Sequence, residues 1–175
     1  MRLPGTLGTT IFGELTGTHS ARCDDIQRAF AAGGVPTQIS DSIIAEMWVK
    51  LFGFATVAAI ATLNRAGAGE IATAPASRGF VNSVIEECAR VTTAEGYPPP
   101  AAMKDNIREL FAQLGSIYSP SILRDLEQGR PTEGEDTIGE LVRRADRRGM
   151  EVPLLQAALC NLQVYDLRRQ QGRAA

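Results

Sequence analysis

The sequence predicts a mainly α-helical domain that is preceded by a short strand–helix–strand segment. Beyond Asp41, apolar residues recur every three or four positions almost to the end of the chain, which is the spacing of amphipathic helices. The residues before Asp41 differ, because they are rich in glycine and threonine around a β-prone centre. The length of 175 residues, with 44% hydrophobic and 22% charged residues, suits one globular domain together with part of another.

The N-terminal segment predicts two short strands joined by a helix. The stretch GTLGTTIFGELTG contains the first strand at residues 9–12, with turns on either side. The stretch SARCDDIQRAFAAGG predicts a helix with Ser20 as its cap and Gly33 as its end, and VPTQIS is a second extended piece. Because two strands are too few to form a stable sheet alone, we expect this segment to be the end of a larger sheet.

Three long helices are expected next. Residues 42–64 form one apolar helix, and residues 78–94 form a second that ends before the PPP stretch. Residues 101–118 give the clearest pattern, in which apolar side chains follow the three-four spacing of one helix face. These side chains are Met103, Ile107, Leu110, Phe111, Leu114, Ile117 and Tyr118.

A short helix is expected in SPSILRDLEQG, with Ser119 as cap, Pro120 at the first helical position and Gly129 as the stop. Polar residues gather here between two helices. They suit either a small polar ligand or ordinary helix capping, and spacing alone favours capping. The group comprises Ser119, Ser121, Asp125, Arg130, Thr132 and Glu133.

Two further helices complete the chain. Thr132 and Glu135 have the spacing of a capping box for a helix at residues 137–148. Val152-Pro153 then opens a last helix that extends to about residue 169.

Composition excludes several classes of function. A net charge of −2 gives no basic face for nucleic acid. The cysteines Cys23, Cys88 and Cys160 are odd in number and form no CxxC pair, so a reducing cytoplasm is expected. His19 and Cys23 could share a helix face, but two ligands do not make a metal site. The uncharged run at residues 51–63 is shorter than the ~20 residues of a membrane span, so we expect a buried core helix and no membrane contact.

The stretch GAGEIA, residues 67–72, matches the dinucleotide-binding pattern G-x-G-x-x-G/A. That pattern binds a pyrophosphate only where a strand precedes it and a helix follows. Here the preceding residues end a long helix, and Pro75 interrupts the following one. We therefore expect a helix end followed by a loop, and no glycine loop for a dinucleotide in this sequence.

Lys50 lies at the edge of the most apolar run in the chain. On a helix it shares a face with Phe54, Val57, Ala58 and Ala61. Partial desolvation there would lower the pKa of the ammonium and suit it to proton transfer. Alternatively, the stem lies over apolar surface while the charged head reaches water. Periodicity alone favours the second interpretation.

Together, several blocks resemble the C-terminal domain of the ketopantoate reductases (2-dehydropantoate 2-reductases). The blocks are MWVKLFGFATVAAIATL, VIEECARVTTAEG and SPSILRDLEQGRPTEGEDTIGELVRRADRRGMEVPLLQAAL, and their order and spacing agree over residues 43–167. The resemblance implies a fold of the ketopantoate reductase / 6-phosphogluconate dehydrogenase C-terminal type. GTLGTTIFGELTG is similar to the closing strands of the family's N-terminal Rossmann domain. We therefore expect residues 1–41 to be the end of a dinucleotide-binding domain and residues 42–175 to be a substrate-binding and dimerisation domain.

The resemblance also implies a function. Members of the family are two-domain, NADPH-dependent oxidoreductases of pantothenate biosynthesis, and the helical half supplies the substrate pocket and often a dimer contact. The family's general acid, a lysine just after a tryptophan, falls on Lys50. Its substrate-contacting serine falls on Ser121, and its glutamate near the reacting groups falls on Glu133. A small 2-keto acid substrate, a homodimer and a Rossmann domain, possibly separate, are the implied partners.

The sequence departs from the family pattern in three places. Phe54 and Ala58 stand where the family places substrate-binding asparagines, and Ile138-Gly139 replaces an asparagine-glycine pair. The glycine loop is missing, so we expect an excised domain or the product of a truncated reading frame, with no NADPH bound to this chain alone. We expect the substrate-binding and catalytic-acid half of a reductase. The alternative is a non-enzymatic helical dimerisation module derived from the family.

Overall fold

A computed structural model describes residues 8–172 of the chain. These residues divide into two compact units, one up to Trp48 and one from Val49 onward. The division falls inside the long helix α2 (Ile43–Asn64).

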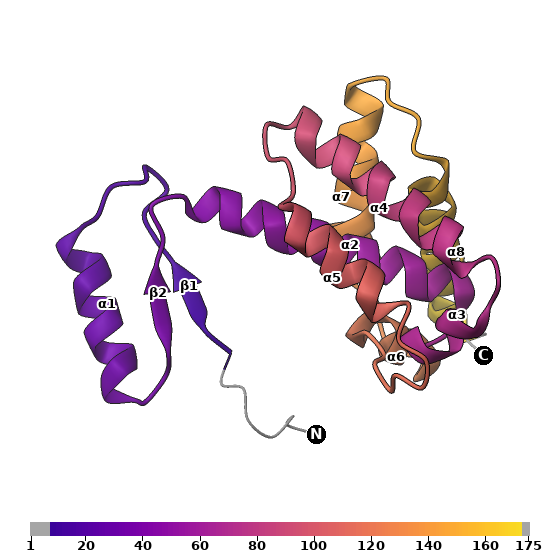
Figure 1. The fold of residues 1–175 in the computed structure, drawn as a ribbon, viewed down its shortest axis with the longest axis horizontal. Helices are drawn as coiled ribbons and strands as arrows, with labels where there is room; N and C mark the ends of the chain where they lie inside the picture. The colour runs from indigo at the N-terminus through magenta and orange to yellow at the C-terminus, as the bar shows by residue number, and fades with distance from the viewer. Residues whose placement is uncertain (1–7, 173–175) are drawn as a thin grey trace. The chain divides into compact units, whose positions relative to one another are not determined.

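The first unit is a parallel βαβ element. Strand β1 (Thr10–Phe12) pairs with β2 (Thr37–Ile39) in parallel, and helix α1 (Ala21–Ala32) connects them and lies beside the strands (Figure 1). The expected strand–helix–strand order is confirmed, as is the cap, because the Ser20 side chain accepts a hydrogen bond from the Cys23 amide. The ring of Phe12 on β1 faces that of Phe30 on α1, with centroids 6.4 Å apart.

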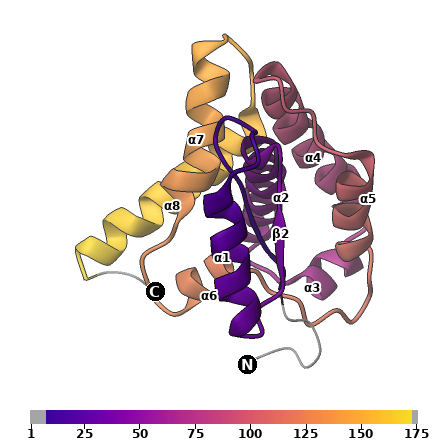
Figure 2. The ribbon, with the colours of Figure 1, turned by 90° about the vertical axis from the view of Figure 1, so that its left-hand side faces the viewer.

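The second unit is helical. Figure 2 looks along α2, with α4 and α5 on one side and α7 and α8 on the other. The tightest packing joins α7 to α8, and α4 contacts both of them. The mainly α-helical prediction is confirmed. The helices after α2 are α3 (Ala68–Thr73), α4 (Ser77–Ala94), α5 (Ala101–Leu110), α6 (Ser121–Glu127), α7 (Gly134–Arg147) and α8 (Pro153–Gln170).

Helix α2 forms the centre of this unit. Phe52 and Ile60 are fully buried, as is the whole run between them except Phe54. The two buried threonines bond to their own helix, Thr56 to the Phe52 carbonyl and Thr62 to the Ala58 carbonyl, both at 2.7 Å. Among the described helices, α2 is long and apolar enough to cross a membrane, with a mean hydropathy of 1.7, but half of that window is buried inside the protein. It is packed as a core helix.

The expected helix at residues 101–118 is shorter than predicted. Helix α5 ends at Leu110, and the following residues up to Pro120 are irregular. Gly115 has a φ of +72°, a conformation that breaks a helix. The irregular segment packs against α3, where the Ala68 amide donates to the Tyr118 carbonyl at 2.9 Å. Leu114 and Ile117 were predicted on a buried face but are 71% and 88% exposed.

Two predicted caps are wrong. Pro120, not Ser119, is the cap residue of α6, and the Ser119 hydroxyl is buried without a partner among residues 8–172. Helix α7 begins at Gly134 rather than after a Thr132–Glu135 capping box. The Thr132 hydroxyl donates instead to Asp166 of α8, at 3.0 Å.

The early start of α7 has a packing reason. A Cβ atom on Gly134 would lie 2.6 Å from Cδ1 of Leu162, so a larger residue here would force the Leu162 side chain to shift. This contact fixes the residues just before α7, which include Glu133.

The start of α8 depends on a buried carboxylate. Glu87 of α4 is 7% exposed and accepts hydrogen bonds from the backbone amides of Leu154 and Leu155, each at 3.0 Å. The first amides of a helix have no partner within the helix, and a negative charge there is favourable. Glu87 therefore joins α4 to α8.

Candidate functional site

The helical unit contains a cavity of about 280 Å³ between α2, α5 and the residues that lead into α6 and α7. Most of its surface is formed by apolar side chains. The lining residues are Gly53, Phe54, Val57, Ala58, Met103, Asn106, Ile107, Leu110, Tyr118, Pro120, Ser121, Ile122, Glu133 and Thr137.

Close packing between α2 and α5 defines one wall. A Cβ atom on Gly53 would lie 3.1 Å from Cε of Met103, so the missing side chain at Gly53 makes room for this methionine. Helix α5 is tied to α4 by Arg108, which donates to the Asn82 side chain at 2.8 Å. The end of α5 at Leu110 then lets the chain turn back, so that Tyr118 and Ser121 lie beside the same cavity.

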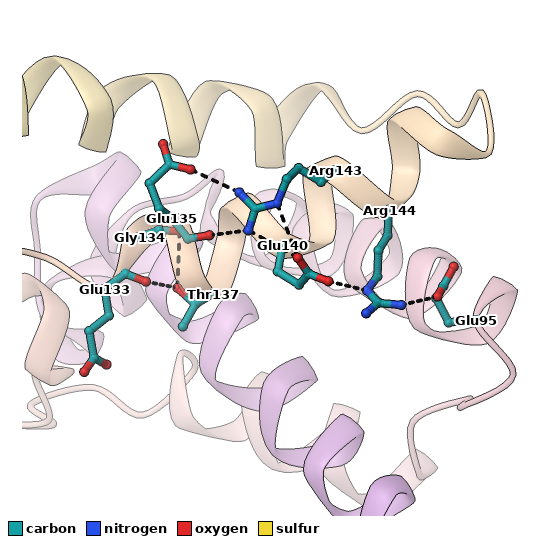
Figure 3. Close-up of polar contacts among 8 residues, drawn as sticks. All are labelled: Glu95, Glu133, Gly134, Glu135, Thr137, Glu140, Arg143 and Arg144. Carbon is teal, nitrogen blue, oxygen red and sulfur yellow. Dashed lines mark hydrogen bonds and ion pairs between the residues drawn. The ribbon is translucent and has the colours of Figure 1, made fainter.

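The two predicted substrate-contacting residues line this one cavity. Ser121 is exposed as the first residue of α6, and Glu133 precedes α7. The Glu133 carbonyl accepts a hydrogen bond from the Thr137 hydroxyl at 2.7 Å. The Glu133 carboxylate extends away from this bond and from the arginines of α7 (Figure 3) and makes no hydrogen bond or ion pair with any residue of 8–172. Both polar groups are therefore available to a ligand.

Lys50 lies one helical turn before Phe54, at the edge of the cavity. Its Nζ atom is 5.4 Å from the centroid of the Phe54 ring, a distance typical of a cation–π contact. Phe54 lines the cavity and is 56% exposed, whereas Lys50 is not one of the described lining residues. Of the two interpretations of Lys50, the exposure of its side chain agrees with the one that periodicity favours, a charged head that reaches water.

Periodicity did not identify three polar residues of the cavity. Asn106 and Thr137 line the cavity, but in the sequence they stand between apolar or capping positions of their helices, and this pattern does not indicate a binding site. Tyr118 was predicted on a helical core face, but it lies in the irregular segment after α5. Burial raises the pKa of Tyr118 above its usual value of 10, so this phenol is protonated at neutral pH.

The glycine-rich stretch at residues 67–72 does not fit a dinucleotide. The stretch at residues 67–72 follows a helix rather than a strand and forms the six-residue helix α3, where a helix end and a loop were expected. A Cβ atom on Gly69 would lie 2.3 Å from the Ser116 carbonyl oxygen, so this glycine serves backbone packing and leaves no room for a pyrophosphate.

Residues 8–172 contain no group of side chains suited to a metal ion, and two of the three thiols are buried. Three or more His, Cys, Asp or Glu side chains do not gather there as ligands would. His19 bonds to Asp24 at 2.7 Å. Cys88 is fully buried on α4, and burial raises the pKa of its thiol to about 12, so this thiol is not a nucleophile at neutral pH.

Known proteins resemble this chain in sequence. Residues 42–166 match the family described as "Ketopantoate reductase PanE/ApbA C terminal". The uncharacterized oxidoreductase YkpB of Bacillus subtilis is 30% identical over 156 residues, which cover 89% of this chain and 52% of that protein. A 2-dehydropantoate 2-reductase of Halobacterium salinarum is 28% identical over 149 residues, 85% of this chain and 49% of that protein. The chain thus spans about half the length of these relatives.

Solved structures share the fold. A PanE/ApbA family ketopantoate reductase from Ralstonia eutropha superposes with a TM-score of 0.78 at 24% identity, covering 93% of this chain and 53% of that one. A dimeric ketopantoate reductase from Staphylococcus aureus superposes with a TM-score of 0.76 at 20% identity, covering 87% of this chain and 53% of that one. A D-mandelate dehydrogenase bound to NADH and anilino(oxo)acetate superposes with a TM-score of 0.74 at 17% identity, covering 93% of this chain and 66% of that one. With a family match over residues 42–166, this chain belongs to the ketopantoate reductase family and contains its helical C-terminal domain.

Proposed function

We propose that this chain supplies the substrate-binding and proton-donating half of a reductase that acts on small 2-keto acids. The supporting observation is the position of three residues. Ser121 and Glu133 line one cavity, and Lys50 contacts Phe54 of the same cavity. These are the residues at which the family resemblance places a substrate ligand, a group near the reacting atoms and the general acid.

Lys50 is the proposed proton donor. When the keto carbon of a 2-keto acid is reduced, its carbonyl oxygen gains negative charge and needs a proton. An ammonium on a flexible four-carbon stem can move from its position over Phe54 to the mouth of the cavity. There it stabilises the developing charge and gives up a proton, and general-acid assistance of this kind contributes ~10²–10⁴ in rate.

Ser121 and Glu133 are proposed to orient the substrate. The Ser121 hydroxyl can donate a hydrogen bond to a carboxylate or keto oxygen of the acid. The Glu133 carboxylate can accept a hydrogen bond from the Lys50 ammonium or from the product hydroxyl. The absence of any partner for this carboxylate within residues 8–172 agrees with a role toward a ligand.

The reductant is proposed to be NADPH held by a dinucleotide-binding domain, as in the family as a whole. We further propose a cytoplasmic homodimer that acts in pantothenate biosynthesis or on a related keto acid. The cysteines, all free, suit a reducing compartment. The exposed apolar side chains Val164 and Leu167 of α8 suit an interface between two copies.

The proposal is tested in a restored two-domain enzyme. Residues 1–175 are joined to the dinucleotide-binding half of the Bacillus relative, and NADPH oxidation is followed with a panel of small 2-keto acids. We expect turnover that depends on the keto acid. A folded protein that binds NADPH but reduces none of the acids would instead favour the non-enzymatic dimerisation module.

A further inference from the structure

We infer that the keto acid of this cavity carries an apolar side chain without a hydroxyl group. This inference rests on the proposed function, because it assumes that the cavity holds a 2-keto acid. It concerns the part of the ligand beyond the keto and carboxylate groups, and it follows from the side chains of the cavity walls.

The wall nearest to the proposed proton donor consists of carbon atoms. Residues four apart on a helix share one face, so Phe54 and Ala58 continue the stripe that begins at Lys50 on α2. Both line the cavity together with Val57. These three side chains carry no hydrogen-bonding group. A substrate whose keto oxygen meets Lys50 therefore places its neighbouring carbons against an apolar wall.

The wall formed by α5 has the same character. Met103, Ile107 and Leu110 all contribute apolar surface to the cavity, and Asn106 is the one α5 lining residue with a polar side chain. The Thr137 hydroxyl is already bonded to the Glu133 carbonyl, at 2.7 Å. Ser121 and Glu133 are engaged by the acid and keto groups in the proposed function. The Asn106 amide and the Tyr118 phenol remain to bond a hydroxyl on the substrate's side chain, and neither lies on α2, the wall nearest to Lys50.

The size of the cavity limits the ligand. A volume of about 280 Å³ equals roughly nine molecules of liquid water, which suits an acid of about ten non-hydrogen atoms. A branched aliphatic 2-keto acid has this size. A hydroxyl group added to it would lose part of its water against the α2 and α5 walls, and a hydrophobic pocket disfavours an added hydroxyl group by up to about 100-fold.

Two acids that differ by one hydroxyl group test this inference directly. They are 3,3-dimethyl-2-oxobutanoate and its 4-hydroxy analogue, ketopantoate. Each is titrated into the 175-residue chain, and amide chemical shifts give the dissociation constant and the residues affected. We expect both acids to shift resonances of cavity residues, and the acid without the hydroxyl to bind about 10-fold or more tightly.

Variants locate the preference in the α2 wall. Phe54 is 56% exposed, so Phe54→Asn keeps the fold while it adds a hydrogen-bonding group, and it should reduce the preference by several-fold. Ala58→Ser, a small change at a buried position, should act in the same direction. Leu15→Asn makes a comparable change at a position of the first unit that is 78% exposed and outside the cavity, and it should leave the preference unchanged.

The outcomes separate this inference from the proposed function. Equal or tighter binding of ketopantoate by the unchanged chain would overturn the inference, while leaving the cavity as a 2-keto acid site. A preference that Leu15→Asn alters as much as Phe54→Asn would also overturn it. If neither acid shifts the cavity resonances, both the inference and the proposed function fail.

Discussion

Phe54 and Lys50 illustrate how one exposed aromatic ring can place a charged group. The Lys50 ammonium lies over the Phe54 ring, 5.4 Å from the centroid of the ring, and the same ring borders the cavity. Lys50 therefore need not be buried to act there, since its stem can carry the charge over the ring edge. An exposed lysine of this kind costs little in stability, because its charge remains hydrated.

Glu87 has the opposite character, and its replacement should destabilise the fold. Glu87→Ala removes an acceptor from two amides at the start of α8, and loss of a charged cap costs about 1–3 kcal/mol. Urea denaturation should show a lower midpoint with an unchanged slope.

The adjacent Glu86 is the matched control for Glu87. Its side chain is 52% exposed and pairs with Lys104 and Arg108, both at 3.2 Å. Exposed pairs contribute about 0–1 kcal/mol, so Glu86→Ala should shift the midpoint much less. Equal shifts for the two variants would mean that Glu87 is not the link between α4 and α8.

At the scale of elements, ion pairs join the end of α4 to α7. Glu95 follows α4 and forms ion pairs with Arg148 and Arg144. Figure 3 shows Arg144 between Glu95 and Glu140, to which it bonds at 2.7 Å. The hydrogen bond from Arg148, and after it the one from Arg144, holds the pKa of Glu95 below its ordinary value of 4.5. The neighbouring arginines favour the ionised carboxylate in the folded state.

This contact predicts a pH dependence of stability. Because the pKa of Glu95 is lower in the folded than in the unfolded protein, its contribution is fully present above pH 4.5 and is lost as the pH falls through the folded value. Glu95→Gln should lower the thermal midpoint by the equivalent of about 1 kcal/mol at pH 7. The difference from the unchanged protein should vanish in strong acid. A difference that persists at low pH would mean that packing, rather than charge, is responsible.

The sequence predicted those elements whose signals are local. Helix α8 begins at Pro153 and α1 is capped by Ser20, as expected, because proline and serine at these positions act through their own geometry. Helix α5 ends early, and the irregular segment after it packs against α3 through a long-range contact, the close approach of Ser116 to Gly69. In the sequence, the glycine at position 69 completes a nucleotide-binding pattern. In the structure, a glycine is needed there because the backbone packs against a segment that is distant in sequence.

The candidate site likewise depends on features that have no local signal in the sequence. Ser121 and Glu133 could be chosen only through the family resemblance, since their spacing is equally typical of helix caps. The cavity that joins them depends on the end of α5 and on the contact of Gly134 with Leu162, neither of which has a local signature. Asn106 gave no signal, because a single amide in an amphipathic helix is typical of a solvated face.

For the whole molecule, we predict that the isolated chain does not bind NADPH tightly. The described glycine-rich stretch lies against the Ser116 backbone and does not follow a strand, so it offers no pyrophosphate site. Calorimetry should detect no micromolar binding. Micromolar affinity of the 175-residue chain for NADPH would contradict this prediction.

We also predict that the chain is a homodimer in solution. The exposed apolar residues of α8 are the surface that a second copy would cover. Light scattering should give a mass near twice the 18.8 kDa of the chain. A mass near 18.8 kDa over a range of concentrations would show that the chain is a monomer.

The role of Lys50 in a restored two-domain enzyme is the most direct test of the account. The sequence contains one other lysine, Lys104 on α5, which pairs with Glu86 outside the cavity and provides the control. Lys50→Ala should lower kcat for a 2-keto acid by ~10²–10⁴, because the proton donor is lost. Lys104→Ala should leave kcat nearly unchanged, and both variants should unfold at similar urea concentrations. Full activity of the folded Lys50→Ala enzyme would contradict the assignment of Lys50 as the acid.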